Sequence, residues 1–453
     1  MHSTFNHTQP VQRPGASAGY QAVILPSISF ALLVSVAAAA EPVSFQREIA
    51  PIFQQRCVAC HGEEKTKGGY RLDTFEWLEK TGDSGEPAKS SLHRLITTPD
   101  ADERMPQKAD ALPAADIALI ERWIAEGARF DGALPTQTLA ELTRSQFLRP
   151  APKTYPRPVP VTALAFNGDG RTLAVGGYHE VLFFRTESAE PPRRVGGLPE
   201  RITAMAWSAK NDLLAVAGGT PGRWGTVALI EPSQRYAVRI LCDLPEQALS
   251  VAISRDGTQL VAGCGDRTVR FFELPSGKQT RVLRLHADWV QSVAFNPAGT
   301  LLVSASRDRT ARLLDPASGE VETTYRAHDS AMLAAVFSAD GSRIFSTARG
   351  GAAHIWHPEK ADKRGGFSEF SGEVEKLASS PLGIAAGGSD GIVRLYQLND
   401  ALPFMKFTGH TAPVQALAMS RNGTWVASGS ADGEVIIWSP ACGTWVRRFL
   451  VQP

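Results

Sequence analysis

A turn signal that recurs through residues 159–453 constrains the fold of this chain more than any other feature. Each of these turn pairs follows a short strand-like segment: Asp169-Gly170, Asp256-Gly257, Ala298-Gly299, Asp340-Gly341 and Asn422-Gly423. The three central turns follow one another at intervals of 42 residues. A period near 42 residues with short alternating strands is typical of a four-stranded sheet repeated around an axis. The repeat therefore predicts an all-β propeller.

The number of blades follows from the third strand of each unit. These strands are expected to close at Phe184, Ile230, Phe272, Leu314, Trp356, Tyr396 and Trp438, which predicts seven blades over residues 159–453. Trp445 to Val451 reads as the outer strand of the last blade, so we expect a ring whose two ends do not interlock. An edge strand supplied by residues near Phe147 to Tyr155 is the alternative.

The last unit carries a recognisable residue pattern. Gly409-His410 opens it and Asp432 precedes Trp438 by six residues, which resembles the WD-repeat family. The resemblance implies that these His, Asp and Trp side chains form a buried hydrogen-bond network that holds the blade together. Other blades keep part of the set: Asp266, His286 with Asp308, His328 with Trp356 but Gly350, and Asp390. Blades one and two depart most, and blade two carries an insertion around Thr220 to Trp224.

A different chemistry is encoded before the repeats. Cys57-Val58-Ala59-Cys60-His61 has the spacing at which two thiols attach to haem vinyl groups and the next imidazole ligates the iron. The same Cys-x-x-Cys pair could belong to a dithiol redox site or to half of a zinc site. We predict one covalently attached haem c, with Cys57 and Cys60 as attachment points and His61 as proximal ligand.

Residues 41–132 have the size and pattern of a small all-α haem domain. Phe45, Ile49, Ile52 and Phe53 recur at helical spacing before the motif, and residues 116–126 form a second apolar stripe. Between them, Met105 lies in a polar, proline-flanked stretch 44 residues beyond His61. This position favours Met105 as the distal iron ligand. His93 or an open sixth position are the alternatives.

These residues together resemble the Planctomycete-type c-type cytochrome domain. The resemblance rests on a series of short segments: Pro51-Ile52-Phe53, the Cys-x-x-Cys-His-Gly run, Gly68-Gly69-Tyr70-Arg71-Leu72-Asp73, Ser91-Leu92, Met105-Pro106 and Trp123-Ile124-Ala125-Glu126-Gly127-Ala128. It implies thioether attachment at Cys57 and Cys60, with His61 proximal and Met105 distal. Gln107 in place of a second proline and Pro113 in place of a helix cap are its departures, and neither concerns a ligand.

The first 40 residues read as a targeting segment. Ala22 to Ala40 is an apolar run that ends in small residues, with Ala38 and Ala40 placed for signal peptidase. We therefore expect export to the periplasm or cell envelope. An uncleaved membrane anchor is the alternative, because the run approaches the roughly 20 residues that a spanning helix needs.

Residues 133–158 are rich in proline and read as a linker, in which Thr138 to Phe147 could add a short helix. The cysteines outside the motif, Cys242, Cys264 and Cys442, are expected to be buried apolar residues and not a disulfide framework.

The charge of the chain limits its partners. The net charge is +1, but residues 41–131 hold 17 acidic and 12 basic residues, so that the rest of the chain is basic. The two modules could attract each other, or a basic redox partner could dock on the acidic module. The sequence has no basic run with interleaved aromatic residues, which is the pattern that would indicate nucleic-acid binding.

Three function classes are compatible with the sequence. The first, which we favour, is a one-electron carrier whose propeller is a platform for a protein partner. The others are a haem subunit of an oxidoreductase complex and a haem-containing scaffold or redox sensor of the cell envelope. The repeats hold no paired acid and base, no nucleophile motif and no cluster of metal ligands, and His179, His354 and His357 read as isolated blade histidines. An enzyme that acts alone is therefore the less favoured class.

Overall fold

The structure is a computed structural model, and it describes residues 41–62, 67–80, 86–107, 109–208, 210–398 and 400–452. None of the helices within these ranges is long and apolar enough to cross a bilayer. The expected signal segment, Ala22 to Ala40, lies outside the described residues.

The first part of the described chain is helical. Its helices and helical turns are η1 (Phe45–Ile49), α1 (Ala50–Arg56), α2 (Val58–His61), η2 (Lys67–Gly69), α3 (Phe75–Lys80), η3 (Pro87–Lys89), α4 (Ser91–Thr97), α5 (Ala114–Ala125) and α6 (Leu139–Phe147). The two apolar stripes form η1 with α1 and α5, as the periodicity predicts. α5 follows Pro113 and has no side-chain cap. The possible short helix after Thr138 is α6.

An aromatic cluster forms the core of this helical module. Phe45 is fully buried, and its ring centroid lies 5.4 Å from that of Trp123 and 4.9 Å from that of Phe75. Phe53 packs edge-on against Trp123 at 6.2 Å. Burial of such large apolar side chains contributes most of the stability of a small module. The two stripes that flank the haem motif in the sequence thus meet in one core.

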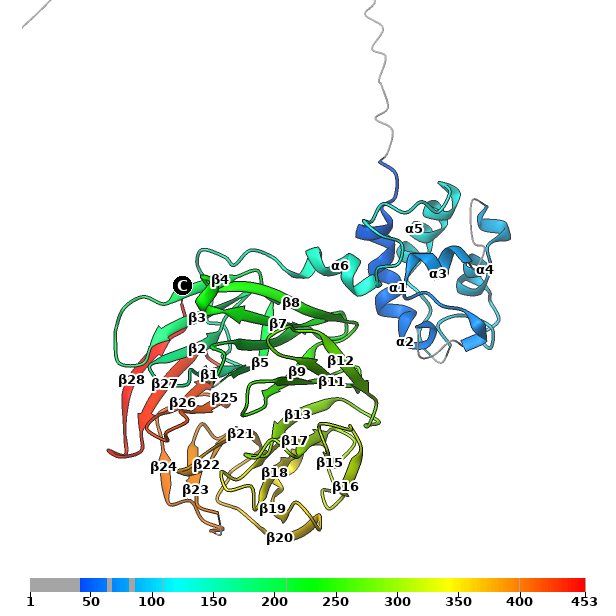
Figure 1. Ribbon diagram of the computed structural model, residues 1–453. Coiled ribbons are helices and arrows are strands. Elements are labelled where there is room, and N and C mark those ends of the chain that lie inside the picture. Colours follow the sequence, from blue (N-terminus) through cyan, green and yellow to red (C-terminus); the bar gives the residue numbers. More distant parts are fainter. Residues whose placement is uncertain are drawn as a thin grey trace, which may run out of the picture. The chain divides into compact units, whose positions relative to one another are not determined.

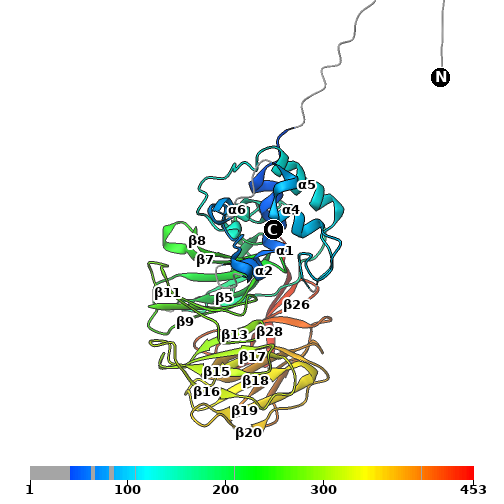
Figure 2. The same ribbon diagram turned by 90° about the vertical axis from the view of Figure 1, so that its right-hand side faces the viewer.

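The second part is the expected seven-bladed propeller, in which seven four-stranded antiparallel sheets surround an axis (Figure 1) and appear from the side in Figure 2. Blades one to four are β1 (Leu164–Phe166), β2 (Thr172–Gly176), β3 (Glu180–Arg185), β4 (Arg193–Gly196); β5 (Arg201–Trp207), β6 (Leu214–Thr220), β7 (Trp224–Glu231), β8 (Ala237–Leu244); β9 (Ala248–Ile253), β10 (Gln259–Cys264), β11 (Val269–Glu273), β12 (Gln279–Leu283); β13 (Val290–Phe295), β14 (Leu302–Ser306), β15 (Ala311–Leu314), β16 (Val321–Tyr325).

Blades five to seven complete the ring. Their strands are β17 (Met332–Phe337), β18 (Ile344–Ala348), β19 (Ala353–His357), β20 (Asp362–Gly366); β21 (Val374–Ser380), β22 (Gly383–Gly388), β23 (Val393–Tyr396), β24 (Met405–Phe407); β25 (Val414–Met419), β26 (Val426–Ser430), β27 (Glu434–Ser439), β28 (Thr444–Leu450). All seven predicted third-strand closures lie in β3, β7, β11, β15, β19, β23 or β27, so the blade count is confirmed.

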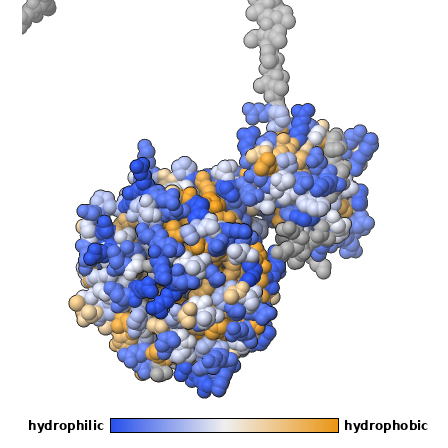
Figure 3. Space-filling model, viewed as in Figure 1, coloured by the Kyte–Doolittle hydropathy of each residue, from blue (hydrophilic) through white to orange (hydrophobic). Residues whose placement is uncertain are grey.

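The core of the propeller lies between the blades. Each pair of neighbouring blades shares one apolar cluster, such as the cluster of Phe407, Ile436 and Trp438 between blades six and seven. Because a blade buries both of its faces against its neighbours, its inner strands are apolar on both sides. On the surface in view, apolar residues show toward the middle of the propeller and hydrophilic residues dominate the rim (Figure 3).

The ring closes without a shared sheet. Blade one uses only β1 to β4 and blade seven only β25 to β28, as the position of Trp445 to Val451 predicts. No strand forms in the described stretch between Phe147 and Leu164, so the alternative edge strand is wrong. The seam is held by contacts between the two blades: Phe184 and Phe449 lie 4.4 Å apart, and Arg447 covers both rings.

Residues 151–161, which we call the strap, lie at this seam. They include the end of the predicted linker and the residues that lead into blade one. The Arg194 guanidinium donates to the Pro152 and Lys153 carbonyls, and the Tyr155 hydroxyl donates to Glu180 at 2.6 Å. Farther along, the Val161 amide donates to the Ser430 carbonyl of blade seven at 3.1 Å. The strap thus contacts the first and the last blade of the ring.

Candidate functional site

The haem motif opens into an apolar cavity of about 190 Å³ within the helical module. Its lining consists of Arg56, Cys57, Cys60, His61, Lys67, Gly68, Tyr70, Leu72, Leu92, Leu95, Ile96, Met105, Pro106, Gln107 and Leu112. All four residues that the sequence singled out for haem therefore lie around one cavity. Most of the other side chains are apolar, which suits a porphyrin better than a hydrated ion.

A helical turn positions the two cysteines and the histidine. α1 ends at Arg56, Cys57 joins it to α2, and the His61 amide donates to the Cys57 carbonyl at 3.0 Å. His61 Nδ1 lies 3.2 Å from the Tyr70 carbonyl oxygen. With Nδ1 protonated and donating to this carbonyl, Nε2 is the ring nitrogen that can ligate a metal.

Met105 reaches the same cavity from the loop after α4. Its amide donates to the Leu95 carbonyl at 2.8 Å, and its half-buried side chain packs against the core of the module. His93, the alternative ligand, is not among the lining residues, and its Nε2 lies 3.9 Å from Glu121 on α5. Of these two candidates, Met105 lines the cavity and His93 does not.

The other cysteines have no part in this site. All three are free thiols: Cys264 on β10 is buried as expected, Cys242 on β8 is half-buried, and Cys442 after β27 is exposed, so the expectation of burial is wrong for Cys442. Burial raises the pKa of Cys242 to about 12 and that of Cys264 well above its usual value. Both therefore remain neutral thiols at ordinary pH, as expected of apolar core residues.

The expected His–Asp pair is complete in blade four. His286 Nδ1 lies 3.0 Å from Asp308, and its Nε2 lies 2.9 Å from the Ser304 hydroxyl. Burial opposes ionisation of Asp308, but hydrogen bonds from His286 and Thr310 outweigh it and hold the Asp308 pKa well below its usual value. The group is a structural network within a blade.

Blade seven departs from the expected arrangement. His410 and Trp438 both bind the Ser428 hydroxyl, at 2.7 and 2.8 Å. Asp432 accepts instead from Thr411 and Ser430, while Glu434 faces His410 Nδ1 at 3.3 Å. The sequence reasoning missed a serine that recurs in the second strand of these blades. It is the central residue of each five-residue strand: Ser304, Ser346 and Ser428.

Blade five has Gly350 in place of the aspartate, and its histidine pairs with a second histidine. His328 and His354 stack with ring centroids 4.0 Å apart, and His328 Nε2 binds the Ser346 hydroxyl at 2.8 Å. His354 Nδ1 lies 3.0 Å from the Tyr325 hydroxyl, so this histidine is not isolated as the sequence suggested. His328 Nδ1 is buried without a hydrogen-bond partner. Burial lowers the pKa of His328 to about 3, with His354 and Lys363 adding to the effect.

The histidine pair predicts that acid destabilises the propeller. Folding disfavours the protonated form of His328. The stability that the protein gains from neutral, buried His328 is therefore complete above the unfolded pKa of 6.5 and is lost progressively as the pH falls below it. Between pH 7 and pH 5 we expect a loss of about 2 kcal/mol at this residue. Urea unfolding of wild type and His328→Gln at both pH values measures the difference. Equal losses in the two proteins would refute this assignment.

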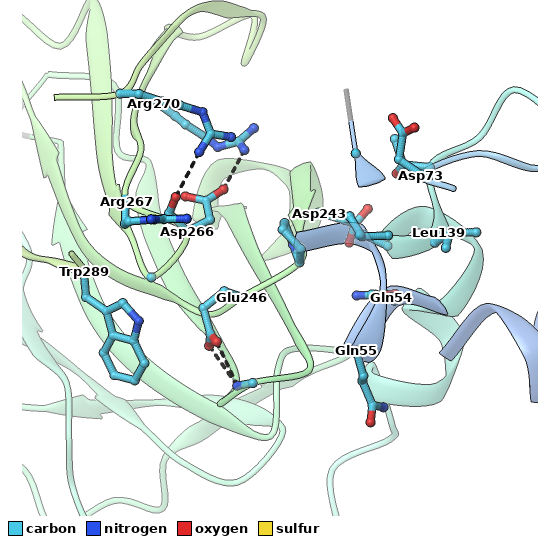
Figure 4. Close-up of a pocket in the computed structure, with 18 of the residues that line it drawn as sticks. Gln54, Gln55, Asp73, Leu139, Asp243, Glu246, Asp266, Arg267, Arg270 and Trp289 are labelled. Atoms are coloured by element: carbon cyan, nitrogen blue, oxygen red, sulfur yellow. Dashed lines mark hydrogen bonds and ion pairs between the residues drawn. The ribbon is translucent and has the colours of Figure 1, made fainter. Parts of the chain in front are cut away.

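A larger polar cleft, of about 660 Å³, lies where the helical module meets the propeller (Figure 4). Gln54, Gln55 and Asp73 line it on one side, and Glu246, Asp266, Arg270 and Trp289 line it on the other. Asp266 and Arg270 pair at 2.9 Å, and Glu246 accepts from the Gly222 amide, so these charges already have partners. Val58 and Gly62 also line the cleft, which places the backbone around the haem motif at its wall.

Comparison with protein families supports both halves of this description. Residues 57–108 match the family described as Planctomycete cytochrome C. Residues 245–273, 277–315, 319–357 and 402–439 match the WD domain, G-beta repeat. These repeats correspond to blades three, four, five and seven, and blades one and two, which depart most in sequence, are not among them.

Similar curated proteins match only short stretches of this chain. The target of rapamycin complex subunit wat1 of Schizosaccharomyces pombe is 41% identical over 70 residues, which are 15% of this chain and 22% of that protein. The WD repeat, SAM and U-box domain-containing protein 1 of Gallus gallus is 35% identical over 88 residues, 19% of this chain and 18% of that protein. The chain thus spans less than a quarter of the length of either relative. It joins a Planctomycete-type cytochrome c segment to a seven-bladed propeller of WD repeats.

Proposed function

We propose that the helical module binds one haem c and exchanges single electrons with a protein partner. In this proposal Cys57 and Cys60 form the thioether bonds, His61 is the proximal ligand and Met105 the distal ligand. The observation that carries it is that these four residues, which span 49 positions of the chain, line one apolar cavity. Haem held in this way supplies reversible one-electron chemistry at the iron.

The residues of the module would serve this role in three ways. The Tyr70 carbonyl fixes the His61 ring through Nδ1 and so determines which nitrogen faces the cavity. The backbone bond from Met105 to Leu95 holds the loop that carries the thioether. Leu72, Leu92 and Ile96 are buried around the cavity and exclude water, which is one of the means by which a protein adjusts a haem potential.

The distal ligand can be tested by Met105→Ala in protein matured with the haem c attachment machinery. We expect the oxidised wild type to have a weak near-infrared sulfur-to-iron band, which the variant loses. The variant should also have a lower reduction potential and bind carbon monoxide, because methionine ligation raises the potential and occupies the sixth position.

Met405→Ala is a matched control, since Met405 is a half-buried methionine of β24 in blade six. It should leave the spectrum and the potential unchanged. A wild-type protein that lacks the band and binds carbon monoxide would instead have an open sixth position. That result would move the assignment from electron transfer to ligand sensing or catalysis.

The propeller is proposed to bind a protein partner, and the chain is proposed to act after export to the periplasm or envelope. WD-repeat propellers commonly present their loops to other proteins, which supports the first statement. The apolar run from Ala22 to Ala40 supports the second, because haem c attachment and signal-directed export belong to the same compartment. The identity of the partner does not follow from the fold, since propellers support many functions.

A further inference from the structure

Helix α6 contacts the helical module with one face and the propeller with another. On one face, Leu139 and Leu142 belong to the core of the helical module, and the Thr143 hydroxyl donates to Gln54 of α1 at 2.7 Å. On the other face, Arg144 and Phe147 contact the propeller. The segment read as a linker therefore contains a helix that is part of both modules.

The polar half of the propeller contact is a buried ion pair. Arg144 Nε lies 2.8 Å from Asp243 Oδ2, and the Asp243 side chain has no exposed surface. Burial raises the pKa of Asp243 even with Arg144 beside it, so the carboxylate depends strongly on this partner. A propeller without α6 would hold an uncompensated charge at β8.

The apolar half is an aromatic stack. The Phe147 ring lies parallel to Trp224, with centroids 5.3 Å apart, and the Arg223 guanidinium lies 5.8 Å from the Phe147 centroid. Trp224 is fully buried at the start of β7. The Gln54 side-chain amide adds a direct bond from α1 to the Arg223 carbonyl at 2.7 Å.

Two of these propeller residues, Arg223 and Trp224, belong to the insertion by which blade two departs from the repeat. The insertion around Thr220 to Trp224 lengthens the β6–β7 hairpin, whose last pair is Thr220 with Trp224. Asp243 stands opposite Thr226 on the neighbouring strand β8. The insertion of blade two thus supplies part of the surface that α6 covers, and strand β8 supplies the rest.

We propose that blade two is an intramolecular docking site for the helical module, with α6 as the segment that it binds. The modules are then one rigid unit, and the proline-rich stretch does not act as a flexible tether. A partner held on the propeller would meet the haem-binding module at a fixed position, beside the cleft walled by Val58 and Gly62. This inference does not depend on haem attachment, because none of its contacts involves the cavity of the haem motif.

The test uses the full chain with the double substitution Phe147→Ala and Asp243→Asn. This variant removes the stack and the ion pair without leaving a buried charge, so each module can still fold. Small-angle X-ray scattering should give a larger radius of gyration and a broader range of shapes than for wild type. Trypsin should cut after Arg144, within α6, about tenfold faster or more, since loss of the contact raises the population of the open form.

Ser145→Ala is the control, because Ser145 is an exposed residue of the same helix. It should scatter and be cleaved like wild type. Equal scattering and cleavage of the double variant and wild type would overturn the proposal. If the double variant does not fold, Phe147→Ala alone decides through the same cleavage rate. Loss of docking with normal haem attachment would separate this inference from the haem assignment.

Discussion

Replacing Arg194 by methionine is expected to lower the free energy of unfolding of the propeller by about 3–5 kcal/mol. Arg194 Nε lies 2.7 Å from Glu180, whose side chain has no exposed surface. The substitution fills a similar volume but leaves the Glu180 carboxylate buried with only the Tyr155 hydroxyl as a side-chain donor. It also removes the hydrogen bonds that Arg194 donates to the Pro152 and Lys153 carbonyls of the strap. The lost stability therefore includes contacts that hold the strap at the seam of the ring.

Chemical denaturation followed by tryptophan fluorescence measures this effect. Arg193→Met is the matched control, because Arg193 precedes Arg194 on β4, is exposed and lies over the Tyr236 ring. Its loss should stay below about 1 kcal/mol. The double variant Arg194→Met/Glu180→Gln should recover part of the stability by removing the buried charge. Equal effects of the two arginine substitutions would contradict a special role for the strap.

The second large effect concerns the haem motif. In protein matured with the haem c machinery, Cys57→Ser/Cys60→Ser is expected to carry no covalent haem, because both thioether bonds need the thiol sulfurs. Intact mass spectrometry under denaturing conditions should find one haem on the wild-type chain and none on the variant. The same spectrum reports the mass of the mature amino terminus and hence any cleavage after Ala40.

Cys442→Ser separates this chemistry from a general effect of losing a thiol. Cys442 is exposed and free after β27, and its replacement should leave the haem stoichiometry at one. A wild-type chain without covalent haem would defeat the haem assignment. It would also return the motif to the dithiol or zinc alternatives, which metal analysis of the same sample can distinguish.

The repeat allowed much of the propeller to be predicted from the sequence. Turn pairs such as Asp256-Gly257 and closures such as Trp438 are local signals, because turn geometry and blade packing act on neighbouring residues. The same holds for the haem motif and for the two apolar stripes of the helical module. Met105 could be proposed because a methionine in a polar loop lacks a core to fill.

The remaining features depend on contacts between distant residues, which no local pattern encodes. The stack of His328 on His354 joins side chains 26 residues apart in a blade that has Gly350 at the position expected for an aspartate. The pairing of Arg144 with Asp243 joins residues 99 positions apart, and neither stands out in composition or spacing. The proline content of residues 133–158 indicated a linker, but it left an edge strand open and gave no sign that residues 151–161 would bind blade one.

Because the ring closes through contacts between blades one and seven and not through a shared sheet, whole blades could be gained or lost during evolution. Every sheet consists of four consecutive strands from one uninterrupted stretch of chain, so no sheet straddles the two ends of the ring. A duplication or deletion of one such stretch would add or remove a complete sheet and leave every other sheet intact. The seam between blades seven and one would then be the interface that must be rebuilt, since only there do contacts join the beginning and the end of the ring.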